Sequence, residues 1–107
     1  MSATLAAIRS LVARRQIKVS VHGNRELAAD NILLEEIAVG IADAVLIEDY
    51  PAYHKGPSVL VLQRDGDGRP VHVMWGLAAG QSSPAVLVTA YRPDSNRWSP
   101  DFLRRRT

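Results

Sequence analysis

The second half of the chain consists mainly of short apolar runs with the length and composition of β-strands. Residues 58–64, 69–77 and 85–92 are rich in valine, leucine, threonine and tyrosine or tryptophan, which as a group favour the pleated surface of a sheet. Residues 65–68, Asp-Gly-Asp-Gly, separate the first two runs, and both residue types tolerate the positive φ angles of a tight hairpin. With residues 44–50 as a preceding strand, the pattern predicts a four-stranded antiparallel meander.

The first half is predicted to be mainly helical. Apolar residues recur at helical spacing in residues 3–15 and 33–42, and residues 22–29 form a shorter helical segment. Residues 16–21 alternate and are interpreted as a short strand or an extended link. Helices followed by a meander predict an α+β fold, in which two or three helices pack on one face of a four-stranded antiparallel sheet.

The composition restricts the function. A length of 107 residues and a net charge of +2 suit a single domain over residues 1–107. The absence of cysteine excludes disulfides, thiolate metal sites and cysteine nucleophiles. No apolar run approaches the roughly 20 residues that cross a bilayer, and the first residues lack a signal-peptide pattern, so we expect a cytoplasmic protein with no membrane contact. From Tyr50 onward the chain has eight Lys/Arg and four Asp/Glu residues. This basic half is compatible with a nucleic-acid partner.

The last part of the chain, residues 94–107, is predicted to be a C-terminal tail. Trp98 and Phe102 are its large apolar side chains, and we expect them to anchor the tail to the body of the domain. The three arginines at positions 104–106 are interpreted as a solvated polar end.

Alternation along the predicted strands brings several polar side chains to the sheet face that points away from the helices. Leu87, Thr89 and Tyr91 share one side of the last strand, and His72 lies on the side of its strand opposite the apolar residues. Glu48 reaches the same region from the first strand. We therefore expect His72, Thr89, Tyr91 and Glu48 to gather on one concave face, in a register that alternation alone leaves open.

Short polar motifs follow one another along the chain: Ser20-x-His22, Glu48-Asp49-Tyr50-Pro51, Arg69-Pro70-x-His72-Val73, Thr89-x-Tyr91-x-Pro93 and Trp98. In order and spacing they resemble the small prokaryotic proteins of the family called domain of unknown function 4258. Gly23 departs from the alanine usual after the first histidine of that family, and Arg25 stands where the family tends to keep a basic residue. The resemblance implies a more distant likeness to RelE- and BrnT-type toxin folds, and hence a toxin-like ribonuclease or RNA-binding module.

Metal-independent RNA cleavage needs a base for the 2′-hydroxyl, an acid for the leaving oxygen and a donor near the phosphorane. Histidine titrates near neutrality and suits either proton role. The hypothesis therefore takes His22 and His72 as the acid–base pair, with Thr89 and Tyr91 as orienting donors. The expected partners are RNA and an antitoxin-like protein.

Substrate binding is assigned to Arg25, Arg92 and Glu48. Arginine presents a fork of donors that fits a phosphate, so Arg25 or Arg92 is expected to clamp the scissile group. Glu48 stands at the end of a predicted strand, where it either contacts the substrate or is simply exposed. The three histidines lack the spacing of metal ligands, so we predict no metal site, and no motif implies a cofactor.

The same residues allow a non-catalytic interpretation. His72 suits a hydrogen-bonded position in the sheet, and His22 suits a place at the start of a short helix. The protein would then be a protein-interaction module, either an accessory protein or one associated with an antitoxin. A third hypothesis is a domain that binds a small ligand or a phosphate. The ribonuclease hypothesis predicts both histidines on one solvent-reachable surface, whereas the module hypothesis predicts buried histidines and an exposed apolar patch.

Overall fold

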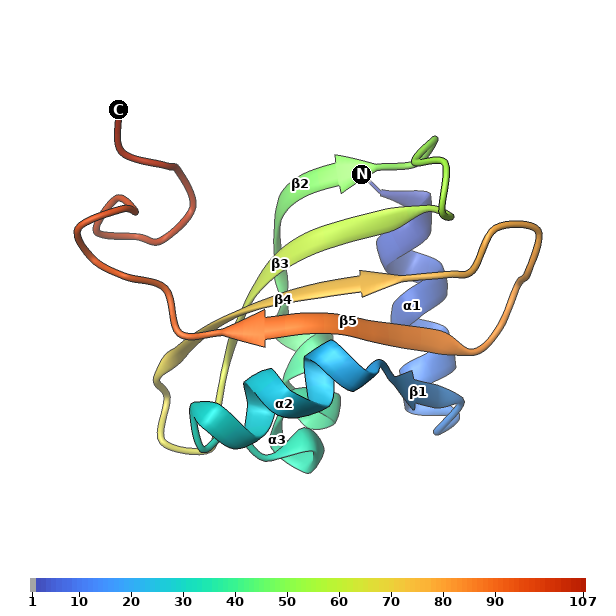
Figure 1. Cartoon of the computed structure of the whole chain (residues 1–107), viewed down its shortest axis with the longest axis horizontal. Coiled ribbons are helices and arrows are strands. Elements are labelled where there is room, and N and C mark those ends of the chain that lie inside the picture. Colours follow the sequence, from blue (N-terminus) through green and yellow to red (C-terminus); the bar gives the residue numbers. More distant parts are fainter. Residues whose placement is uncertain (1) are drawn as a thin grey trace.

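Three α-helices, one 3-10 turn and five strands make up residues 2–107, the part of the chain that the computed structural model describes (Figure 1). In chain order they are α1 (Ala3–Ala13), β1 (Ile17–Val19), α2 (Val21–Ala29), α3 (Leu34–Gly40), η1 (Ile41–Asp43), β2 (Val45–Tyr50), β3 (Ser58–Arg64), β4 (Pro70–Gly76) and β5 (Ala85–Tyr91). None of these helices is long and apolar enough to cross a membrane. The predicted α+β class is confirmed.

The sheet has five strands in the order β1-β5-β4-β3-β2, and not the four that were predicted. β2 to β5 form the expected antiparallel meander. The additional strand, β1, pairs in parallel with β5 and aligns Ile17 with Ala85. Three residues are too few for alternation to separate a strand from an extended link, and their partner lies far along the chain, which is why the sequence left both options open.

One face of the sheet carries the hydrophobic core. Its fully buried strand residues alternate along β3 and β4 and meet the apolar stripes of α1 and α3. They are Val59, Val61, Val71, Val73, Trp75, Ala85, Leu87 and Ala90. The remaining helix, α2, lies alongside β5 next to β1 (Figure 1). The opposite face of the sheet carries no helix and is the face on which the polar residues were expected.

A β-bulge in β5 changes which side chains reach that open face. Met74 pairs with Thr89 whereas Trp75 pairs with Leu87, so Val88 is the extra residue. Leu87 is therefore buried in the core, and the prediction that it shares a side with Thr89 and Tyr91 is wrong. Strict alternation fails here because one inserted residue moves the side chains that precede it in the strand to the opposite face of the sheet.

Ser20 attaches α2 to this bulge. Its side-chain oxygen caps the helix by accepting from the backbone N–H of Gly23 at 2.8 Å, and its hydroxyl donates to the carbonyl of Val88, also at 2.8 Å. Gly23 is buried against the strand, and a Cβ added there would lie 2.8 Å from the carbonyl oxygen of Leu87. The missing side chain thus lets helix and strand approach closely.

Replacing this glycine tests the close approach. Alanine in a free helical position would stabilise the protein by about 1 kcal/mol relative to glycine. We expect Gly23→Ala to destabilise it instead, by about 1–3 kcal/mol, because the methyl group collides with backbone that cannot rotate away. Urea denaturation of Gly23→Ala beside the exposed neighbour Asn24→Ala would measure this. A Gly23→Ala protein as stable as the wild type would contradict the packing described here.

Candidate functional site

His72 lies in β4 on the open face of the sheet and is fully buried. Its Nε2 is 2.8 Å from the carbonyl oxygen of Phe102, and its Nδ1 is 3.1 Å from the hydroxyl of Tyr91. A carbonyl can only accept, so Nε2 carries the proton and Nδ1 accepts the hydrogen bond of Tyr91. Both nitrogens of a neutral ring are therefore satisfied.

The C-terminal tail covers this histidine. The ring of Trp98 meets His72 edge-on, with centroids 4.3 Å apart and planes at 88°, and Trp98 is itself buried. Burial lowers the pKa of His72, the hydrogen bond to Phe102 opposes this, and the nearby Arg105 guanidinium lowers the pKa further. Burial also raises the pKa of Tyr91, which keeps its hydroxyl protonated as a donor. His72 thus joins the tail to the sheet.

Arg105 closes the outside of this cluster. Its Nη1 lies 2.8 Å from Glu48 Oε2, and its guanidinium carbon lies 5.0 Å from the centroid of the Trp98 ring. The hydrogen bond from Arg105 lowers the pKa of Glu48 despite partial burial. Glu48 therefore lies near His72 and Tyr91 as expected. Its carboxylate is paired with Arg105 of the protein itself, however, and not left free for a substrate. Arg105 was missed because a terminal arginine run carries no signal of a tail that folds back on itself.

His22 and Arg25 lie elsewhere, on α2. Both are exposed, and His22 Nε2 is 3.4 Å from Glu26 Oε1, its neighbour one turn along. The inward face of α2 is set by Gly23 and Leu27, which are buried, so their helical neighbours point to solvent. His72 has no exposed surface to share with His22. The expected acid–base pair is therefore not assembled.

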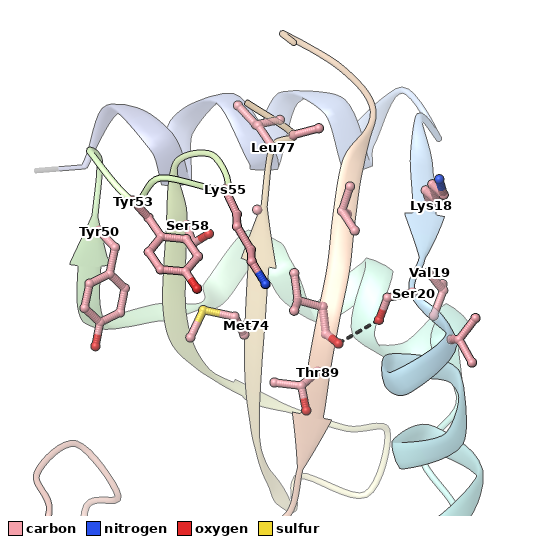
Figure 2. A pocket seen from close by; sticks show the side chains of 15 residues that line it. Lys18, Val19, Ser20, Tyr50, Tyr53, Lys55, Ser58, Met74, Leu77 and Thr89 are labelled. Atoms are coloured by element: carbon pink, nitrogen blue, oxygen red, sulfur yellow. Dashed lines mark hydrogen bonds between the residues drawn. The ribbon is translucent and has the colours of Figure 1, made fainter. Parts of the chain in front are cut away.

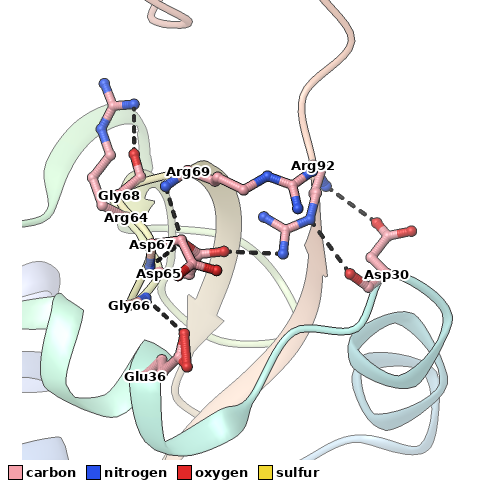
Figure 3. Close-up of polar contacts among 9 residues, drawn as sticks. All are labelled: Asp30, Glu36, Arg64, Asp65, Gly66, Asp67, Gly68, Arg69 and Arg92. Atoms are coloured by element: carbon pink, nitrogen blue, oxygen red, sulfur yellow. Dashed lines mark hydrogen bonds and ion pairs between the residues drawn. The ribbon is translucent and has the colours of Figure 1, made fainter.

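Arg92 is held in a polar contact with two other elements (Figure 3). Its Nη2 lies 3.0 Å from Asp65 Oδ2 in the β3–β4 hairpin, and its backbone N–H donates to Asp30, which follows α2, at 3.2 Å. Desolvation works against the charge of Asp65, but hydrogen bonds from Arg69 N–H and Arg92 outweigh it and lower the pKa of Asp65. Arg92 thus connects α2 to the hairpin, with its charge already paired.

Beyond the tail, the open face forms a groove of about 890 Å³ (Figure 2). Tyr50 and Tyr53 stand on the β2 side, and Lys18 and Ser20 stand on the β1 side (Figure 2). The floor is mostly aliphatic, and Thr89, one of the predicted catalytic residues, lies in it. The complete lining is Lys18, Val19, Ser20, Val21, Tyr50, Tyr53, Lys55, Ser58, Met74, Gly76, Leu77, Ala78, Val86, Val88 and Thr89. None of these described lining residues carries a carboxylate.

The candidate residues are thus divided among separate places. His72, Tyr91 and Glu48 belong to the cluster under the tail, Thr89 to the groove, and the remaining three to the outer face of α2 and the hairpin contact. Within residues 2–107, no three His, Asp or Glu side chains lie together in a way that could hold a metal ion.

The sequence profile of the family described as Domain of unknown function (DUF4258) matches residues 19–92. The chain belongs to this family. The match runs from the last residue of β1 to just beyond β5 and includes His22, His72, Thr89 and Tyr91 of the motifs noted above. No curated protein and no solved structure matches the chain, so the likeness to RelE- and BrnT-type folds stays a prediction.

The burial of His72 predicts a pH-dependent stability. Its pKa is lowered on folding, so the unfolded chain binds more protons, and stability is present above the ordinary value of about 6.5 and is lost as pH falls below it. The slope for one proton is at most about 1.4 kcal/mol per pH unit. Urea denaturation between about pH 7.5 and 5.5 would measure it. Because carboxylates also contribute to the pH dependence of stability at lower pH, variants are compared to isolate the contribution of His72.

We expect His72→Gln to lose this slope, and His54→Gln, in the exposed loop after β2, to keep it. His72→Gln should also destabilise the protein at neutral pH by about 1–3 kcal/mol, since a buried partner loses its hydrogen bond. An unchanged slope in His72→Gln would show that another group is responsible.

Proposed function

We propose that this protein is a non-catalytic interaction module, and that the groove on the open sheet face docks an amphipathic segment of an acidic protein partner. The observation that carries the proposal is the chemistry of the groove. An aliphatic floor is flanked by two tyrosines and two lysines, with no carboxylate among its lining residues.

Exposed apolar side chains support a docking role. Val21 is 71% exposed, Tyr53 47%, Tyr50 38% and Val88 37%, and all four line the same groove. Soluble proteins rarely leave a contiguous apolar patch open unless it contacts a partner. Tyrosine is enriched at such contacts, because a rigid aromatic body is combined with a polar end.

The charge of the rim selects the partner. Lys18 comes from β1 at one edge of the apolar floor, and Lys55 comes from the loop after β2 and reaches over the floor beside Tyr53 (Figure 2). A helix that lays an apolar face into the groove would bring its flanking residues to these lysines. Aspartate or glutamate at those flanking positions complements the lysines, and lysine there would be repelled.

The ribonuclease alternative lacks an assembled pair of proton-transfer groups. The ring nitrogens of His72 are occupied by Tyr91 and Phe102, whereas His22 is exposed on a different element. General acid–base catalysis needs both groups within hydrogen-bond reach of one substrate. The interaction-module hypothesis expected both histidines to be buried: His72 is buried with a backbone partner, whereas His22 is exposed. The open apolar groove is the feature of that hypothesis that supports the proposal.

A designed peptide pair tests the proposal directly. Each synthetic helix carries the same leucine face, with glutamates flanking it in one and lysines in the other. We expect the glutamate peptide to bind the wild type, and the Lys18→Glu/Lys55→Glu protein to prefer the lysine peptide, which fluorescence anisotropy would measure. Val88→Asp should weaken the affinity of the protein for the glutamate peptide by at least about tenfold, equivalent to about 1.4 kcal/mol of binding free energy.

The matched control is Val39→Asp, because Val39 is 65% exposed on α3 and lies outside the groove. Its affinity for the glutamate peptide should equal that of the wild type. Equal binding of the two peptides by the wild type, or equal losses in Val88→Asp and Val39→Asp, would overturn the assignment of the groove.

A further inference from the structure

A second hollow, of about 690 Å³, lies between the end of β5 and the folded-back tail. It shares no lining residue with the groove, and its character is opposite, since its surface is mostly polar. Four arginines line it, Arg92, Arg97, Arg105 and Arg106, together with Tyr91. We call this hollow the arginine cleft.

Two of these four guanidinium groups are already neutralised by the protein. Arg92 pairs with Asp65 at 3.0 Å, and Arg105 pairs with Glu48 at 2.8 Å. These pairs fix the positions of both side chains on the wall of the cleft. Their charge is therefore not the main source of attraction for a ligand.

The other two guanidinium groups form no ion pair within the described part of the chain, and both retain free donors. Arg106 uses Nε to donate to the carbonyl of Ser95 at 2.9 Å, which leaves its terminal nitrogens uncommitted. Within the described part of the chain, no hydrogen bond or ion pair involves the Arg97 side chain, which is exposed. The backbone N–H of Arg106 donates to the carbonyl of Arg97 at 2.8 Å, so the two residues lie side by side.

One side-chain carboxylate lines the cleft, beside the last residue Thr107, and it is partly committed. Asp94 Oδ1 accepts from the backbone N–H of Asn96 at 2.8 Å, as a turn residue does. Two arginines that neighbour each other along the backbone, each with uncommitted donors, therefore line the cleft together with one side-chain carboxylate that caps a turn. Paired arginine forks of this kind fit the oxygens of a phosphate better than an ammonium group does.

We propose that the arginine cleft binds the phosphate backbone of a short single-stranded nucleic acid through Arg97 and Arg106, with a base stacked on Tyr91. The cleft is much larger than one phosphate group, which favours a chain of nucleotides over a free ion. Aromatic rings beside a cationic track are the usual means of binding single strands without sequence preference. This binding is independent of the protein-docking groove.

The test uses a fluorescein-labelled, single-stranded oligoribonucleotide of mixed sequence, with anisotropy measured over a range of salt. We expect Arg97→Ala/Arg106→Ala to bind at least about tenfold more weakly than the wild type, and the slope of log affinity against log salt to fall by about 1.4, for two lost contacts at about 0.7 each. Arg14→Ala/Arg104→Ala removes the same charge away from the cleft and should bind within about twofold of the wild type.

A second measurement uses the unaltered protein and so does not depend on how the variants fold. Trp98 lines the cleft and Trp75 lies in the core, so the oligonucleotide should shift the indole N–H resonance of Trp98 and leave that of Trp75 unchanged. Val88→Asp, which disables the groove, should retain nucleic-acid binding.

Three outcomes would overturn the proposal. Equal losses in the two double variants would show attraction by overall charge alone. A shift of Trp98 with inorganic phosphate but not with the oligonucleotide would show a site for the free ion. Absence of any Trp98 shift would show that the cleft is not occupied.

Discussion

The hydrogen bond from His72 Nε2 to the carbonyl of Phe102 determines how the open face of the sheet is divided. A buried imidazole must have partners for both nitrogens, because an unsatisfied polar atom costs free energy comparable to a lost hydrogen bond. Phe102 supplies one partner from the tail and Tyr91 supplies the other from the adjacent strand. The tail is thereby held over one end of the face and leaves the other end open as the groove.

This attachment also produces the arginine cleft. Phe102 has a φ angle of 62°, in the left-handed region that a bulky residue rarely adopts. The bridge between Trp98 and Arg105 then turns the last residues back along the tail. Without that reversal Arg97 and Arg106 would not be neighbours. The groove and the arginine cleft therefore both depend on the buried His72, which fixes the position of the tail.

Much of the fold follows from local sequence signals. The meander, its Asp-Gly-Asp-Gly hairpin and the three helices depend on periodicity and turn chemistry, which act over a few residues. What escaped prediction depends on distant partners. The three residues of β1 become a strand only by pairing with β5, and Val88 becomes a bulge only where Ser20 holds its carbonyl.

The part of the site that could be predicted is the set of residues that share the open face of the sheet. His72, Tyr91 and Glu48 do converge, because period-two alternation and the order of the strands bring them together. The position of His22 depended on which side of α2 packs inward, and that is decided by the contact of Gly23 with Leu87. Arg92 looked like a phosphate ligand because guanidinium chemistry is the same whether its partner is a substrate or Asp65.

The exposure of the two histidines favours binding over catalysis. Acid–base chemistry requires a group that exchanges protons with a substrate and titrates near the working pH. His72 has the close contacts of such a group but no access to a substrate, and His22 has access but only Glu26 beside it. A binding surface needs only a fixed shape and fixed charges. The His72–Phe102 hydrogen bond holds the tail at one end of the open face, and the Ser20–Val88 hydrogen bond holds the β1 side of the groove. The contacts that shield His72 from a substrate therefore also help to give the docking surface its fixed shape.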